Sequence, residues 1–139
     1  MADLGTVVLT EEIISSMNAL GGFVTSSPIK KVKFEWTSVN GGGDAGKACK
    51  TTNNVFTGEI IRFVTIPAVA PNAPTDDYDI TITDEDGTDI LMGAGANRDT
   101  TNTEQVLASS LGCVANDKLT INVAAAGNAK QGTTIIYIR

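Results

Sequence analysis

Apolar and polar residues alternate most clearly in residues 78–83 (YDITIT). A period of two predicts a strand with one apolar face and one polar, acidic face. Asp86-Gly87 follows, and Asp-Gly is a typical hairpin turn because it accepts positive φ. We therefore expect residues 88–92 to form the return strand of a β-hairpin. The core-facing side chains of the first strand would be Tyr78, Ile80 and Ile82.

Two further stretches indicate strands. In Ile29–Thr37 the apolar residues alternate with lysines and a glutamate, and Trp36 is expected to anchor the core. Residues 55–66 carry apolar residues on both faces, as in a central strand, and Gly58 there predicts a bulge or a close approach of another chain segment. The polar segment 38–54 between them reads as a glycine-containing loop.

The second half of the chain predicts a loop that crosses between two sheets and a hairpin near the end of the sequence. Residues 67–74 (PAVAPNAP) are too rich in proline for a strand or helix, so we expect a loop that crosses between sheets. Residues 118–125, in which Leu119, Ile121 and Val123 alternate with other residues, and residues 133–138 flank a glycine-containing loop and predict a closing hairpin. Thr101 and Glu104 have capping-box spacing, so residues 101–110 predict either a short helix or a strand near 104–108.

The N-terminal region is ambiguous. Residues 6–9 could be a first strand or an ordered arm, and residues 11–20 could be a helix or extended, with Gly21-Gly22 as its end. Short strands without strand–helix alternation predict an all-β fold. We expect an antiparallel β-sandwich of jelly-roll or Ig-like type over residues 30–139, preceded by an N-terminal extended arm or short helix over residues 1–29.

Charge and composition exclude several function classes. A net charge of −6, with scattered basic residues, argues against nucleic acid as a partner. No stretch approaches the ~20 apolar residues of a membrane span, and residues 1–22 lack a signal-peptide pattern. The expected site of synthesis is therefore the cytoplasm. Cys49 and Cys113 could form a disulfide, but free thiols are favoured without secretion.

One segment approaches a phosphate-binding motif. Residues 41–48 (GGGDAGKA) match GxxxxGK[ST] except at Ala48, which lacks the hydroxyl that binds magnesium in such loops. The residues that follow do not open an amphipathic helix. We therefore expect no nucleotide or other cofactor, and a hairpin loop explains the glycines.

The acidic residues around the predicted turn raise a calcium hypothesis, since hard cations prefer oxygen ligands. An EF-hand loop that begins at Asp84 would need glycine at its sixth position, but Gly87 is only three residues after Asp84. No glutamate occupies the twelfth position of such a loop. A solvated turn is favoured, so no metal is expected. If one binds, the candidate ligands are Asp84, Asp86 and Asp89.

Catalytic groups are sparse in this sequence. It contains no histidine and no GxSxG motif, and neither cysteine has a neighbour in the sequence that would activate it. The acidic residues show no spacing that selects a catalytic pair. We therefore expect no enzymatic activity.

Residues 30–139 contain several segments in an order that is typical of one group of proteins. KKVKFEWTS, FTGEIIRFVTIP and LTINVAAAGNAKQGTTIIYIR flank the pattern APTxxYDxTxxDxxGxDxLxGxGANR, which residues 73–98 match. In these features the chain resembles small β-rich virion proteins of tailed bacteriophages. The resemblance covers about four-fifths of the chain and omits residues 1–29.

The resemblance implies a non-enzymatic component of a virion, assembled in the host cytoplasm. The expected partner is the major capsid protein, which a head decoration (cement) protein would bind and stabilise, or other virion proteins. Homo-oligomers, with trimers plausible by symmetry, are expected. The alternatives are a tail or neck accessory protein and a carbohydrate- or cell-surface-binding sandwich, whose candidate stacking aromatics are Trp36, Tyr78 and Tyr137.

Overall fold

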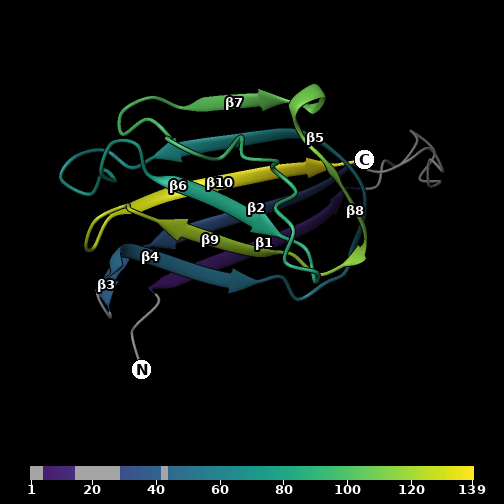
Figure 1. Cartoon of the computed structure of the whole chain (residues 1–139), viewed down its shortest axis with the longest axis horizontal. Coiled ribbons are helices and arrows are strands. Elements are labelled where there is room, and N and C mark those ends of the chain that lie inside the picture. The colour runs from purple at the N-terminus through teal and green to yellow at the C-terminus, as the bar shows by residue number, and fades with distance from the viewer. Residues whose placement is uncertain (1–4, 15–28, 42–43) are drawn as a thin grey trace, which may run out of the picture.

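The computed structural model describes residues 5–14, 29–41 and 44–139 (Figure 1). Its strands are β1 (Thr6–Ile14), β2 (Ile29–Thr37), β3 (Val39–Gly41), β4 (Asp44–Thr51), β5 (Phe56–Pro67), β6 (Asp79–Thr83), β7 (Glu104–Leu107), β8 (Cys113–Asp117), β9 (Thr120–Ala124) and β10 (Gln131–Ile138). Within these residues the only helical element is the 3₁₀ turn η1 (Ala108–Ser110). The all-β prediction is confirmed.

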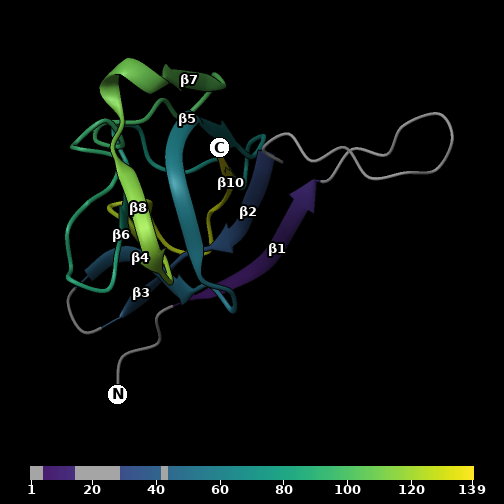
Figure 2. The same ribbon diagram turned by 90° about the vertical axis from the view of Figure 1, so that its right-hand side faces the viewer.

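The strands form two antiparallel sheets. The larger sheet has the order β1-β2-β10-β5-β7, with β8 also paired to β5. The smaller sheet has the order β3-β4-β9-β6. Figure 2 shows β1 at one margin of the larger sheet, with β2 and β10 next to it and β5 beyond. The predicted central strand is confirmed, because β5 pairs with β10 on one side and with β7 and β8 on the other.

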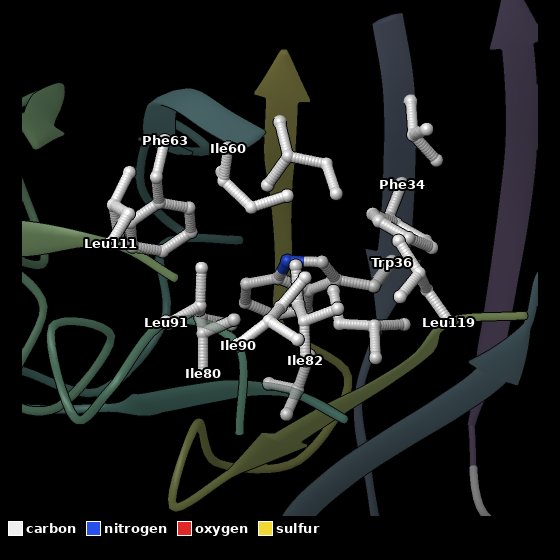
Figure 3. Packing of buried hydrophobic residues seen from close by; sticks show 14 of the residues in the cluster. Phe34, Trp36, Ile60, Phe63, Ile80, Ile82, Ile90, Leu91, Leu111 and Leu119 are labelled. Atoms are coloured by element: carbon white, nitrogen blue, oxygen red, sulfur yellow. The ribbon is translucent and has the colours of Figure 1, made fainter. Parts of the chain in front are cut away.

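The hydrophobic core is one cluster with members from both sheets. Figure 3 shows Phe34, Ile60 and Phe63 of the larger sheet directed towards residues of the smaller sheet. Trp36 connects the two sheets directly, because its ring centroid lies 5.5 Å from that of Tyr78. The prediction of a core-facing row is confirmed, and its members, on β6 and directly before it, are fully buried: Tyr78, Ile80 and Ile82.

Two glycines allow this packing. A Cβ built on Gly132 would lie 2.3 Å from Cζ2 of Trp36, so the indole can lie against β10 only because that residue has no side chain. Gly58 has φ of +144°, and a Cβ built on it would lie 2.5 Å from the carbonyl oxygen of Arg139. The register of β5 and β8 shifts between Phe56 and Gly58, so both the bulge and the close approach predicted there are confirmed.

The predicted return strand at residues 88–92 is wrong. Only Asp89 forms a bridge, to Thr83, and residues 90–95 continue as turns. β6 pairs instead with β9 along its whole length. Residues 90–95 run along the other edge of β6. There the carbonyl oxygen of Gly95 accepts a hydrogen bond from the amide of Ile80 at 2.8 Å.

The predicted closing hairpin is also wrong. β9 belongs to the smaller sheet and β10 to the larger one, so the segment between them crosses between the sheets. The segment 67–74 makes a crossing too, from β5 to β6, as predicted. The polar segment 38–54 is not a loop, because β3 and β4 occupy most of it and β4 pairs with β9.

Residues 104–107 form the strand β7, which decides between the two alternatives there. Asp99 makes the preceding turn, because its carboxylate accepts hydrogen bonds from the amides of Thr101 at 2.7 Å and Asn102 at 3.1 Å. These bonds hold the pKa of Asp99 below its usual range, with the amide of Thr101 as the largest cause. Glu104 accepts from the amide of Asp99, so the expected capping box does not start a helix.

Part of the predicted arm is a strand of the larger sheet. β1 pairs with β2 over nine residues, from Thr6 opposite Thr37 to Ile14 opposite Ile29. Gly5 is packed where a Cβ would lie 2.6 Å from the carbonyl oxygen of Lys47 on β4. Residues 11–14 are extended in β1, so the helix alternative is wrong there, and residues 15–20 of the predicted helix lie outside the described residues with the rest of residues 1–28. The division of the chain near residue 29 stays a prediction.

Candidate functional site

The acidic turn after β6 brings three carboxylates together. Asp84 and Asp86, both predicted as candidate ligands, lie with Asp117 of β8 so that one oxygen of each is within 4.8 Å of the others. Asp117 was not predicted as a ligand. It is distant from Asp84 and Asp86 in the sequence, and no motif around it indicates a metal site. Oxygen atoms at this spacing could serve a hard cation as ligands.

The third predicted ligand, Asp89, does not belong to this group. Its carboxylate accepts hydrogen bonds from the amides of Ile82 at 3.2 Å, Leu91 at 3.1 Å and Gly93 at 3.0 Å. Asp89 thus fixes the turn against β6 and satisfies an amide at the edge of that strand. Its role in the structure is to hold the backbone.

Local hydrogen bonds also account for the acidic turn itself. Oδ1 of Asp84 accepts from the amides of Asp86 at 3.0 Å and Thr88 at 2.9 Å, as in an Asx turn. A hydrogen bond with Asp117 raises the pKa of the exposed Glu85, with smaller contributions from desolvation and from the charge of Asp117. The turn is therefore crowded with acidic groups, and the expectation that no metal binds it stays a prediction.

The described residues of the motif-like segment 41–48 belong to β3 and β4, which pair antiparallel. Gly46 has φ of +92°, and a Cβ there would lie 2.2 Å from the amide nitrogen of Gly127. The carbonyl oxygens of Ala45 and Gly46 accept hydrogen bonds from Gly127 and Ala126. This glycine is needed for packing against the β9–β10 connection. Gly46, Lys47 and Ala48 lie inside β4, whereas in a phosphate-binding loop a helix would begin here.

The two cysteines are free thiols, as favoured by the sequence. Cys49 is half-buried on β4, and Cys113 is exposed at the start of β8.

A buried polar pair lies between the sheets. The hydroxyls of Tyr78 and Thr65 are buried without a hydrogen-bond partner of good geometry. Burial raises the pKa of Tyr78 to about 12, although Thr65 is close enough to work in the opposite direction. The phenol therefore stays protonated at neutral pH.

The larger sheet turns a mixed apolar and basic surface to solvent. We call this surface the outer face. Its three cross-strand rows are Val8, Glu35, Thr133 and Ile66; Thr10, Lys33, Ile135 and Val64; and Glu12, Lys31, Tyr137 and Arg62.

The apolar side chains of the outer face are on the side away from the core. Val64 and Ile135 are buried but lie outside the core cluster, whereas Val8 is 64% and Ile66 37% exposed. A hollow of about 330 Å³ lies over the first row, lined among others by Val8, Thr133 and Ile66. A concave surface that combines apolar and polar groups is typical of sites that bind a partner.

Basic side chains lie in the second and third rows, to one side of the hollow. The guanidinium of Arg62 lies 5.2 Å from the centre of the Tyr137 ring, and the ammonium of Lys31 lies 6.0 Å from it. Arg62 also donates two hydrogen bonds to Gln105. Lys33 pairs with Glu35 at 3.2 Å. Arg62 is therefore held in position by neighbours on two strands.

Comparisons with known proteins leave the function open. The chain matches no model of a known protein family, and no curated protein is significantly similar to it in sequence. Within the described residues, no helix has the length and apolar character needed to cross a membrane.

Proposed function

We propose that this protein is a non-enzymatic structural component of a tailed-bacteriophage virion that binds the major capsid protein and decorates the head. The proposal combines the resemblance of residues 73–98 to phage virion proteins with one structural observation. That observation is the outer face, where Val8 and Ile66 are exposed around a hollow.

The outer face suits attachment to a repeated protein surface. Apolar side chains in a hollow supply the central contact of an interface, and basic groups beside it supply orientation towards an acidic partner. Lys31, Lys33 and Arg62, in the two neighbouring rows, would provide these groups. The shifted pKa values of the described residues belong to a buried phenol and to two acidic groups in turns, which does not suggest a catalytic group.

The finer fold assignment belongs to the same proposal. Two antiparallel sheets with a common core, linked by crossings after β5 and β9, support a β-sandwich of jelly-roll or Ig-like type. Such a domain presents one sheet to a partner while the core keeps the sheet rigid.

The carbohydrate-binding alternative is less well supported. Sugar-binding sandwiches stack exposed aromatic rings on the sugar, but Trp36 and Tyr78 are buried in the core. Tyr137 is half-buried and already lies under Arg62. The candidate stacking residues therefore leave little aromatic surface for a sugar.

Electron microscopy of the particle encoded with this chain tests the location. Density for the two-sheet domain in a regular lattice over the shell is the expected result. A ring at the portal or along the tail would instead assign the tail or neck role. Absence of the protein from purified particles, measured by mass spectrometry, would refute both.

A matched pair of variants tests the attachment surface. Ile66→Glu places a charge in the hollow, and Thr81→Glu places the same charge on the exposed side of β6. We expect Ile66→Glu to lower the number of bound copies per particle about tenfold, because a buried interface disfavours an unpaired charge. Thr81→Glu should bind normally. Equal occupancy of both variants would remove the outer face from the proposal.

A further inference from the structure

The margins of the two sheets are protected to different degrees. An exposed strand edge offers unpaired backbone groups to other chains, and proteins usually shorten, bend or cover it. β3 has three residues and an irregular register, and β7 has four residues. β8 has five residues and pairs with β5 across a bulge. These three margins are short or irregular.

The edge of β6 is covered by the turn segment that follows it. The amide of Ile80 donates to Gly95, the carbonyl oxygen of Ile82 accepts from Ile90, and the amide of Ile82 donates to Asp89. The carbonyl oxygen of Tyr78 accepts from the amide of Arg98 at 2.7 Å. The outward groups of this strand are thus already satisfied.

β1 lacks these protections over most of its length, and only towards its end does the carboxylate of Glu11 accept hydrogen bonds from the amides of Asn53 and Asn54. The strand is nine residues long, contains no proline, and pairs with β2 without a register shift. Figure 2 shows it as the margin of the larger sheet, with no other described strand beyond it. Its two glutamates stand towards one end, while residues 6–10 are uncharged.

The register assigns the outward backbone groups of β1. The amide of Ser38, next to β2, donates to Lys130 next to β10, so alternate residues of β2 such as Trp36 also face β10. The residues between them, such as Glu35, face β1. The N–H and C=O groups of Val7, Leu9 and Glu11 therefore point away from β2. The described residues make no hydrogen bond to these backbone groups.

We propose that the outer edge of β1 pairs antiparallel with β1 of a second copy of this chain, with Leu9 opposite the partner's Leu9. A two-fold axis through this pair would join the two larger sheets into one continuous sheet. The inference is independent of the proposed virion role, because it rests on the sheet edges alone.

Charge selects this register. With Leu9 at the centre, Glu11 stands opposite the partner's Val7, and Glu12 opposite the partner's Thr6. A register centred on Glu11 would place glutamates opposite each other, which is unfavourable. Parallel pairing in register would do the same. The antiparallel arrangement thus brings the acidic end of each strand to the uncharged end of the other.

Sedimentation of the full chain with exchanged charges tests the pairing. Thr6 and Glu12 are both exposed, and they lie ~20 Å apart along one strand. Thr6→Glu adds a repulsion with the partner's Glu12 at both ends of the interface. We expect wild type to be a concentration-dependent dimer and Thr6→Glu to dissociate about 10-fold more readily.

The double variant Thr6→Glu/Glu12→Lys restores an opposite-charge pair and should recover the wild-type dimer. Glu12→Lys alone measures the effect of changing the charge opposite Lys31 of β2 within one copy. Thr81→Glu measures the effect of an added negative charge at a position away from β1. A wild type that is monomeric over roughly a hundredfold concentration range would overturn the proposal. So would a dimer unaffected by Thr6→Glu, or a trimer that ignores these charges.

Cross-linking gives a second readout that does not depend on repulsion. In the proposed register Val8 faces the partner's Thr10 in a non-hydrogen-bonded pair, where Cα atoms are ~4.5 Å apart and a disulfide fits. Val8→Cys/Thr10→Cys, in a background with Cys49→Ser and Cys113→Ser, should form a covalent dimer under mild oxidation. Single-cysteine variants should give much less. Failure of the double variant to cross-link would exclude this register, and with it the proposal as stated.

Discussion

The two sheets share one core but present different surfaces to solvent. The outer face of the larger sheet combines exposed aliphatic groups with Lys31, Lys33 and Arg62. The smaller sheet carries short hydroxyl and amide side chains, and Thr51 and Thr120 are joined across two of its strands at 2.8 Å. The acidic group of Asp84, Asp86 and Asp117 lies at one end of the molecule.

This difference shows that the net charge of the chain does not describe its faces. The whole chain carries −6, yet the rows of the outer face contain three basic residues and two acidic ones, a balance of +1. A partner approaching that face meets a weakly basic, apolar surface, whereas one approaching the acidic turn is repelled if it is itself acidic. Binding is therefore expected to depend on orientation.

Trp36→Ala should have the largest effect, because it breaks the connection between both sheets. The side chain is buried, contacts Tyr78, and donates to the buried hydroxyl of Thr134 at 3.3 Å. We expect a loss of ~3–5 kcal/mol in the free energy of unfolding, measured by chemical denaturation. Val55→Ala, at a 48% exposed position, is the control. A loss below ~1 kcal/mol would show that the two sheets are stable separately.

Asp89→Ala should affect the smaller sheet alone. Removing its carboxylate leaves three backbone amides without their acceptor, including that of Ile82 in β6. We expect a loss of about 2 kcal/mol and faster hydrogen exchange at residues 80–93, with slow exchange retained in β2 and β10. Asp76→Ala removes one exposed hydrogen bond, to Thr100, and should cost less. Faster exchange throughout both sheets would contradict a local role.

Tyr78→Phe should be nearly neutral at pH 7, within ~0.5 kcal/mol, because the phenol oxygen has no well-formed hydrogen bond to lose. At high pH the variant should be the more stable protein. The pKa of Tyr78 is about 12 when folded against 10.0 for an unperturbed phenol, so the unfolded chain ionises first and wild-type stability falls between these values. Alkaline denaturation of both proteins measures the difference. Identical curves would mean that the phenol is accessible.

Calcium should have the smallest effect. Oδ1 of Asp84 already accepts two backbone hydrogen bonds, so the acidic turn is formed without an ion. We expect no heat of binding in calorimetry and no change in melting temperature. Binding heat abolished by Asp117→Asn would instead identify the three-carboxylate group as a metal site.

Much of the local structure could be predicted from the sequence. The strand Ile29–Thr37 was predicted at its observed bounds, because apolar and polar residues alternate from Lys31 to Trp36 and the sequence SSP at residues 26–28 marks its beginning. Gly58 was interpreted correctly as well. Both features are set by a few neighbouring residues, so the surrounding fold does not change them.

The partners of the strands could not be predicted in the same way. β9 and β10 have the pattern of a hairpin, yet a connection of that length can equally carry the chain into the other sheet. The segment of β4 was mistaken for a loop because its alanines, lysines and glycine have low strand propensity. Asp117 joins the acidic turn only through the pairing of β8 with β5. These features depend on contacts between residues far apart in the chain.

The position of β10 has a consequence for how the protein is made. β10 lies between β2 and β5, yet it is the last of the described strands to leave the ribosome. Until it emerges, β2 and β5 each lack the neighbour that joins them, and the growing chain exposes the strand edges that a chaperone would recognise. The larger sheet can close only after residue 138 has been translated, so folding of this sheet waits for the last of its described strands.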